Sequence, residues 1–152
     1  QTVADLGCGP GFYTLALAEY VGDGGKVYAV DVDARAVGTL QRKAAKRGLR
    51  NIEAHPRSAS ELGFIKDASV DFVLCNGLLC SMAPKDLTAT LSEIVRILKP
   101  AGTAYISVAT GPWSYVDLSG WAKILEGFEV RWRKRGFIGL EHRAAVVSPK
   151  KS

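Results

Sequence analysis

The sequence predicts an α/β protein built on a mostly parallel β-sheet with helices on both faces. Short apolar segments of strand length alternate with amphipathic helical segments along the 152 residues, and such alternation is typical of a parallel sheet. The last two strand segments, 128–132 and 142–147, are separated by too few residues for a helical crossover, which needs at least about 10. We therefore expect these two strands to form an antiparallel hairpin.

The stretch 2–19 begins the pattern, and the rest of the chain is organised around it. Residues 2–6 suit a short buried strand, and three glycines at alternate positions follow it, Gly7, Gly9 and Gly11. The apolar residues after them favour a helix that packs on the sheet. Glycines let the backbone adopt unusual dihedral angles, and a helix start offers unpaired N–H groups. This order predicts a ligand site at the carboxyl end of the sheet.

The remaining elements follow in order, and most are bounded by residues that end regular structure. The glycine-rich segment 22–25 ends the first helix, and Gly48 ends a second helix that Asp33 caps. Pro84 precedes the most clearly amphipathic helix, and residues 99–102 are expected to form a turn. The other strands are expected at residues 26–30, 52–55, 70–75 and 103–108, with a short helix at 119–125 before the hairpin.

Composition limits the class of protein. Apolar residues make up 47% of the chain and charged residues 23%, which are ordinary values for a globular domain. No apolar run reaches the roughly 20 residues needed to span a bilayer, so we expect no membrane association. His55 and His142 lack metal-ligand spacing, so no metal is expected. An odd number of cysteines favours reduced thiols and a cytoplasmic location, and these are Cys8, Cys75 and Cys80.

The net charge of +5 comes largely from two basic clusters, 42–50 and 131–135. One interpretation is that they are solvated surfaces of a helix and of the hairpin. The alternative is that they attract an anionic substrate or RNA. Net charge of this size is compatible with both, and no sequence motif supports nucleic-acid binding.

The spacing of the glycines distinguishes a dinucleotide site from other ligand sites built on a glycine turn. The dinucleotide fingerprint is G-x-G-x-x-G, but here Phe12 stands at the third position and the glycine comes one residue early, at Gly11. Asp5, at the strand end, would repel a pyrophosphate and attract an ammonium group. The pattern D-x-G-x-G-x-G resembles motif I of the class I S-adenosylmethionine-dependent methyltransferases. The resemblance places Asp5 near the ammonium of the cofactor, with the backbone curling around it at Gly7, Cys8 and Gly9.

The resemblance covers nearly the whole chain and implies a three-layer, Rossmann-like fold. Its seven-stranded sheet has the order 3-2-1-4-5-7-6, with the last inserted strand antiparallel, and the expected hairpin agrees with it. L-K-P-A-G at 98–102 matches the L-K-P-G-G of the family. The family usually has helices before motif I, whereas Gln1 directly precedes the first strand. We therefore expect residues 1–152 to form a single core domain that lacks these helices, either as a minimal core or as a truncated piece of a longer enzyme. The resemblance is to the small-molecule, methyltransferase type 11 subgroup, and the site is expected to be open.

Three further segments are candidates for contact with the adenosyl group. Asp31 follows the second strand, where a carboxylate can accept both hydroxyls of a ribose, although a nicotinamide cofactor would use the same feature. By resemblance, Val32 packs on the adenine face. R-S-A-S-E-L at 57–62 resembles the G-D-A-x-x-L of the family, so Ser58 stands where an aspartate usually meets the adenine amino group, with Ala59 beside the ring. An ordinary polar loop is the alternative for Ser58.

Residues of the later loops are candidates for cofactor or acceptor contact. Asn76 lies in C-N-G-L-L, which resembles the S-N-x-x-L loop of small-molecule methyltransferases and not the N/D-P-P-Y of base and amide methylators. A turn-capping role is the alternative for Asn76. Methyl transfer from a sulfonium depends mainly on positioning, so catalytic side chains are poorly marked. Tyr13 could border the sulfonium, and Tyr115 could contact substrate, although Trp113 and Tyr115 fit a core edge equally well.

These features predict an S-adenosylmethionine-dependent methyltransferase that transfers a methyl group to a small-molecule acceptor by in-line displacement, with S-adenosylhomocysteine as product. One alternative is an RNA or protein methyltransferase. The other is a cofactor-binding module without its own activity. The sequence does not predict the acceptor atom, a catalytic base or the oligomeric state.

Overall fold

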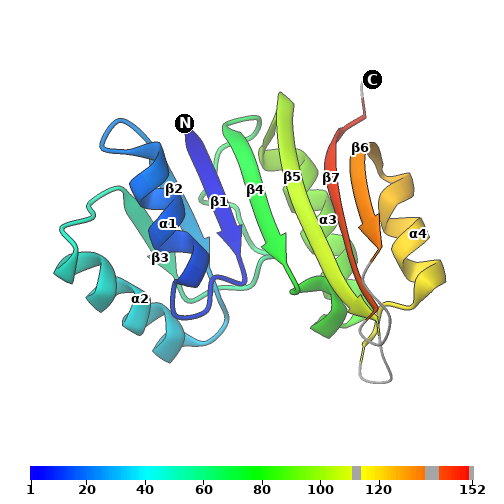
Figure 1. Ribbon diagram of the computed structural model, residues 1–152, viewed down its shortest axis with the longest axis horizontal. Helices are drawn as coiled ribbons and strands as arrows, with labels where there is room; N and C mark the ends of the chain where they lie inside the picture. The colour runs from blue at the N-terminus through cyan, green and yellow to red at the C-terminus, as the bar shows by residue number, and fades with distance from the viewer. Residues whose placement is uncertain (111–113, 136–140, 151–152) are drawn as a thin grey trace.

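A computed structural model describes residues 1–110, 114–135 and 141–150. Seven strands form one sheet in the order β3-β2-β1-β4-β5-β7-β6 (Figure 1). The first five strands are parallel, and β7 pairs antiparallel with both β5 and β6. The order and the final hairpin predicted from the sequence are therefore confirmed. The strands are β1 (Thr2–Leu6), β2 (Lys26–Val30), β3 (Ile52–His55), β4 (Val70–Asn76), β5 (Leu98–Thr110), β6 (Phe128–Arg135) and β7 (Glu141–Pro149).

Helices cover both faces of this sheet. On one face, buried residues of α1 and α2 pack with residues of β1, β2 and β3, and on the other face α3 and α4 pack on β4, β5 and β7. Every helix within the described residues is too short or too polar to span a bilayer. The helices are α1 (Phe12–Val21), α2 (Ala34–Lys46), α3 (Pro84–Ile97) and α4 (Leu118–Glu126), with a 3-10 turn, η1 (Leu79–Ser81), after β4.

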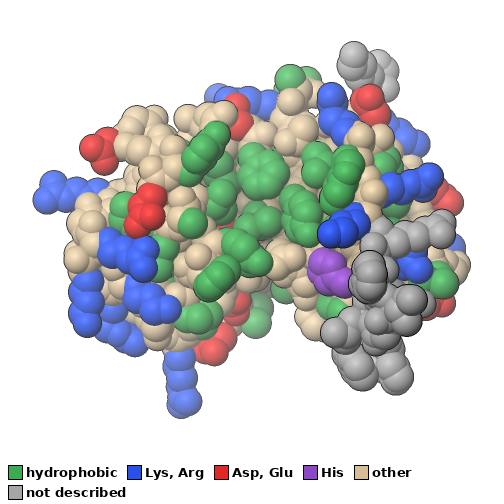
Figure 2. Space-filling model, viewed as in Figure 1, with side chains coloured by type: hydrophobic (Ala, Val, Ile, Leu, Met, Phe, Trp, Pro, Cys, Tyr) green, Lys and Arg blue, Asp and Glu red, His purple; other side chains and the backbone are tan. Residues whose placement is uncertain are grey.

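The helical layer formed by α1 and α2 leaves part of its face open. Figure 1 shows no described helix in front of β4, β5 and β7, and Figure 2 shows hydrophobic side chains gathered there. Pairing of the strands places Leu74, Tyr105, Val146 and Trp132 in one row across four strands. The Trp132 side chain is 48% exposed. The apolar sheet surface therefore continues beyond α1 into solvent in the part of the chain that is described.

The helix ends agree with the signals in the sequence. The Asp33 Oδ1 atom accepts a hydrogen bond from the Arg35 N–H at 2.8 Å, which caps α2. Gly22 follows α1 with φ +67°, and Gly48 follows α2 with φ +69°. The predicted cap and both predicted glycine stops are therefore confirmed.

Residues 99–102 differ from the expected turn, because they lie inside β5. This strand begins at Leu98, which pairs with Val70, and regular pairing resumes where Thr103 meets Phe72. Between these two points the register shifts, because one residue of β4 stands opposite the four residues 99–102 of β5. The local sequence indicates a turn between separate elements, whereas pairing with β4 on both sides makes residues 99–102 part of one strand.

Gly11 fixes how closely α2 approaches the start of α1. Its φ of +89° lies in the left-handed region, which glycine adopts without strain. A Cβ atom at this position would lie 2.5 Å from Leu40 Cδ1, and Leu40 is fully buried. The third glycine of the motif therefore serves the packing of α2 on the turn, as well as the turn itself.

We predict that Gly11→Ala lowers the free energy of unfolding by about 2–5 kcal/mol. Left-handed backbone costs an alanine about 1–2 kcal/mol, and the clash with Leu40 adds roughly 1–3 kcal/mol. Gly48→Ala is the matched control, because Gly48 also has positive φ but an added Cβ meets nothing within 4 Å. Urea unfolding of both variants measures the difference, and equal losses would contradict the packing role of Gly11.

Candidate functional site

The turn between β1 and α1 lies at the carboxyl edge of the sheet and is open on one side. The Gly7 and Cys8 N–H groups donate to the Val30 carbonyl oxygen at 2.8 and 3.0 Å, which joins the turn to the end of β2. Gly9 has φ +51°, and a Cβ added there would meet no atom within 4 Å. The backbone at Gly9 therefore borders open space.

Asp31, directly after β2, holds this turn in place. Its Oδ2 atom accepts a hydrogen bond from the Gly9 N–H at 2.8 Å, and its Oδ1 atom accepts one from the Asp33 N–H at 2.9 Å. Each carboxylate oxygen has a second lone pair that can accept another hydrogen bond. The half-buried carboxylate can therefore bind donors of a ligand while it keeps its contacts with the protein.

Asp5 lies beneath the turn and is 3% exposed. Its Oδ2 atom accepts a hydrogen bond of 2.6 Å from the Thr14 Oγ1–H, and Thr14 is 0% exposed. Burial raises the pKa of the Asp5 carboxyl to about 6, the Thr14 hydrogen bond opposes this rise, and the charge of Asp31 adds to it. The Asp5 carboxyl group is thus shielded from solvent and hydrogen-bonded to Thr14.

The thiol of Cys8 lies near the carboxylates of Asp5 and Asp31. Cys8 is buried, and its Sγ atom lies 3.6 Å from the Gly9 carbonyl oxygen. Burial, followed by the charges of Asp5 and Asp31, raises the pKa of the Cys8 thiol to about 12. The thiol therefore stays neutral near pH 7, and the side chain packs under the turn.

The predicted adenine-side residues lie around a shallow pocket of about 510 Å³ next to Asp31. Val32 lines this pocket and is 76% exposed. Ser58 also lines it, and the Ser58 Oγ atom lies 2.7 Å from Ser60 Oγ. The Ala59 side chain is buried in the core, which leaves its backbone for contact with a ligand.

The loops after β4 and β5 are held together at the same edge. The Asn76 Oδ1 atom accepts a hydrogen bond from the Ser107 Oγ–H at 2.7 Å, and the Gly77 N–H donates to Ser107 Oγ at 3.0 Å. The Tyr115 N–H donates to the Cys80 carbonyl oxygen at 2.9 Å. Asn76 therefore bonds to β5, and the exposed Tyr115 is anchored through its backbone beside η1.

Two aromatic side chains stand at the start of α1. Tyr13 is 45% exposed, and its ring meets the more exposed Phe12 ring edge-on with centroids 4.9 Å apart. Tyr13 was expected from the sequence, whereas Phe12 was noted only because it replaces a glycine. The third predicted aromatic, Trp113, lies outside the described residues.

Sequence reasoning missed Thr14 and Ser107, both of which are fully buried polar side chains. Thr14 lies in an apolar helical segment and Ser107 in an apolar strand. In such segments a Ser or Thr is easily interpreted as a surface residue with no particular role. Their positions were the available signal, since Thr14 follows the glycine turn by three residues and Ser107 lies on the strand beside Asn76. Each missed residue is hydrogen-bonded to a predicted site residue: Thr14 to Asp5, and Ser107 to Asn76.

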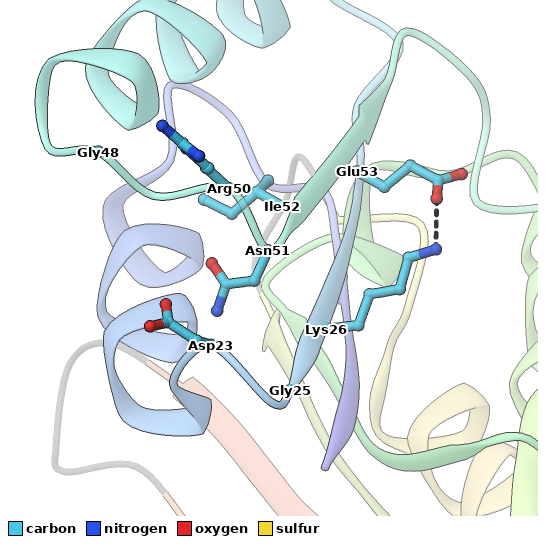
Figure 3. A pocket seen from close by; sticks show the side chains of 8 residues that line it. All are labelled: Asp23, Gly25, Lys26, Gly48, Arg50, Asn51, Ile52 and Glu53. Carbon is cyan, nitrogen blue, oxygen red and sulfur yellow. Dashed lines mark ion pairs between the residues drawn. The ribbon is translucent and has the colours of Figure 1, made fainter.

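A second pocket, of about 800 Å³, lies at the opposite edge of the sheet, where β2 and β3 begin (Figure 3). One wall is formed by the ion pair of Lys26 and Glu53, with 2.6 Å between the Lys26 Nζ and Glu53 Oε2 atoms. The Asn51 Nδ2 group donates to the Ala18 and Gly22 carbonyl oxygens, which secures the end of α1. These contacts stabilise the fold, and ligands of open α/β sheets bind at the other edge.

Comparison with known proteins identifies the family. Residues 3–102 match the family model described as a methyltransferase domain. The chain belongs to the class I methyltransferase family. It is 36% identical over 98 residues to the demethylmenaquinone methyltransferase of Geobacillus stearothermophilus, an alignment that covers 64% of the chain and 41% of that protein.

Two further relatives agree with this assignment. A cypemycin N-terminal methyltransferase from Streptomyces is 32% identical over 123 residues, with 81% of the chain and 47% of that protein covered. A solved S-adenosylmethionine-dependent methyltransferase from Aquifex aeolicus superposes with a TM-score of 0.81 at 27% identity, covering 98% of the chain and 82% of that protein. The chain spans about half the length of the curated relatives it matches.

We predict that Asp5→Asn removes a pH-dependent loss of stability. The Asp5 pKa is 3.8 ordinarily and about 6 in the folded protein, so the folded state binds more protons than the unfolded state between these values. Stability therefore falls as pH rises from about 4 to 6, by roughly 2–3 kcal/mol in total, and stays reduced above pH 6.

Thermal unfolding of the wild type and Asp5→Asn between pH 4.5 and 8 measures this effect. The variant should be the more stable protein above pH 7, and the two curves should converge toward pH 4.5. Asp23→Asn, an exposed aspartate far from the turn, is the control and should follow the wild type. Parallel curves for wild type and Asp5→Asn would show that Asp5 ionises without penalty.

Proposed function

We propose that the chain binds S-adenosylmethionine at the glycine turn and that its protein transfers the methyl group to a small-molecule acceptor. The observation that carries the proposal is the pair of carboxylates, Asp5 and Asp31, on either side of the turn. Among the described residues, no ion pair joins a Lys or Arg side chain to either of them. Such a site repels a diphosphate and attracts a ligand that carries positive charge.

The residues around the turn fit the parts of this cofactor. The remaining lone pairs of Asp31 would accept the ribose hydroxyls, and the pocket beside Val32 and Ser58 would take the adenine ring. The open backbone at Gly9, with Asp5 beneath it, would take the charged methionine portion. Ala59 would contact the cofactor through its backbone, so its side chain can stay in the core.

When bound, the cofactor supplies an electron-poor methyl group on a sulfonium, with a neutral thioether as leaving group. The protein then has to hold the acceptor in line and keep water away. Three side chains could do so: Asn76 at the end of β4, Tyr13 in the first turn of α1, and Tyr115 in the segment before α4. Asn76 is oriented by its hydrogen bond from Ser107, which makes it the best-fixed polar side chain on the acceptor side.

Only the names of the relatives indicate which class of molecule accepts the methyl group. One relative is named for demethylmenaquinone, which favours a small molecule. Another is named for methylation of an N-terminus, which makes an amine at a peptide terminus the second candidate. Within the described residues, no group of three or more His, Cys, Asp or Glu lies close enough together to hold a metal ion.

We predict that Asp31→Ala weakens the binding of S-adenosylhomocysteine tenfold to over a hundredfold. Charge-assisted hydrogen bonds contribute about 1.5–3 kcal/mol, which corresponds to that range of affinity. Asp33→Ser is the matched control, since serine can also cap α2 and the Asp33 side chain accepts its hydrogen bond from the Arg35 N–H at its own helix start. Calorimetry that finds unchanged affinity in Asp31→Ala would remove Asp31 from the ligand site.

Transfer of a labelled methyl group to a panel of acceptors tests the activity itself. The panel should contain a quinol and a peptide with a free N-terminal amine, and we expect the quinol to be labelled. Labelling of the peptide alone would change the acceptor class. Binding of the cofactor without any transfer would favour a cofactor-binding module, and absence of binding would refute the proposed function.

A further inference from the structure

An apolar groove lies between α3 and α4, on the face of the sheet opposite α1 (Figure 1). Its volume is about 460 Å³. The lining residues Val116 and Ile124 are buried and belong to the core, whereas Leu87 and Leu91, on α3, are half-buried. A pocket of this size is large enough for a small molecule, and its lining suits an apolar one.

Lys123, on α4, gives the groove a positive charge. Among the described residues that line the groove, Lys123 alone is charged, and within the same part of the chain no ion pair joins its ammonium group to a carboxylate. The hydroxyl of Thr88 donates to the Pro84 carbonyl oxygen at 3.0 Å, within α3. Apolar walls and one cation complement a ligand that has an apolar body and one acidic group.

One end of the groove lies close to the glycine turn. Leu78 packs against Gly7, since a Cβ atom added at Gly7 would lie 3.2 Å from Leu78 Cδ1. The turn η1 follows Leu78, and its Cys80 carbonyl oxygen accepts a hydrogen bond from the Tyr115 N–H at 2.9 Å. Tyr115 lines the groove, and so does Met82, directly after η1. The single turn η1 therefore connects the groove to the proposed cofactor site.

From this end the groove runs back along the two helices. Because α3 leads from β4 to β5, and α4 from β5 to β6, both helices run away from the carboxyl edge of the sheet. The lining residues of α3 extend from Pro84 to Leu91, which is about 10 Å along a helix. Lys123 lies in the last turn of α4, so its charge is on the side of the groove away from the glycine turn.

We propose that this groove holds the apolar body of the methyl acceptor, with an acidic group of the acceptor bound to Lys123 and the methylated atom at the opposite end, beside the glycine turn. The proposal rests on the proposed function, because only a methyltransferase has a methyl acceptor. It assigns the substrate to a class, elongated apolar molecules with a carboxylate at one end and a nucleophile at the other.

Titration of the chain with octanoate, followed by methyl NMR, tests the groove. We expect the signals of Leu87, Leu91 and Ile124 to shift and to saturate, while those of Val146, on the open face of the sheet, stay in place. Shifts at Val146 without shifts in the groove would overturn the proposal. Groove signals that move with protein concentration alone would overturn it too, because a second copy of the chain would then occupy the groove.

Lys123→Met tests the charge, because methionine keeps much of the apolar stem of lysine. The variant should bind octanoate about two- to fivefold more weakly, the range for exposed ion pairs, and should bind octanol no more weakly than the wild type does. Lys46→Met, an exposed position on α2, is the control for net charge and should keep the wild-type affinity. An equal loss for octanoate and octanol, or the same loss in Lys46→Met, would overturn the role of Lys123.

Methyl transfer to a matched pair of quinols connects the groove to the acceptor. One quinol carries a carboxyalkyl chain, and the other carries an alkyl chain of the same length. The first should have a KM about two- to fivefold lower, by the same ion pair. Lys123→Met should remove this difference and leave the affinity for S-adenosylhomocysteine unchanged. Equal KM values for the two quinols in the wild type would overturn the proposal.

If neither quinol is methylated, a longer probe decides. Dodecanoate held at Lys123 should extend past Met82 and shift the methyl signals of Leu78, which octanoate should leave in place. Leu78 signals that respond to neither probe would separate the groove from the glycine turn and overturn the inference, while binding of S-adenosylhomocysteine would leave the proposed function intact. If S-adenosylhomocysteine does not bind, the proposed function itself fails, whatever the groove binds.

Discussion

The hydrogen bond from the Gly9 N–H to the Asp31 carboxylate is the contact on which the site depends. It joins the turn after β1 to the residue after β2, so two neighbouring strand ends and the start of α1 become one unit. The turn can follow this path because Gly9 and Gly11 adopt left-handed dihedrals, and because Gly11 lets Leu40 approach. The parallel order of the sheet then brings the loops after β4 and β5 to the same edge.

The electrostatics of this edge follow from the same arrangement. Closing the turn over the end of β1 buries Asp5, and closing it against β2 places Asp31 nearby. Among the described residues, neither carboxyl group forms an ion pair with a Lys or Arg side chain. We expect the ionised Asp5 to lower the stability of the free protein, and a positively charged ligand would relieve that cost.

Much of the fold could be predicted because its signals are local. The glycines after β1, the cap at Asp33 and the short connection before β7 each depend on a few neighbouring residues. That residues 99–102 belong to β5 could not be predicted, because it depends on pairing with β4 on both sides of them. In the site, charged and glycine positions were visible as a motif, whereas Thr14 acts through a contact with a residue on another element.

We propose that the glycine turn holds a positively charged adenosyl compound and not a dinucleotide. Calorimetric titration of the purified chain near pH 7.5 with S-adenosylmethionine and, separately, with NAD tests it most directly. We expect saturable binding of S-adenosylmethionine and no measurable heat from NAD, because a diphosphate would be repelled by Asp5 and Asp31. Tight binding of NAD, with no response to S-adenosylmethionine, would contradict it.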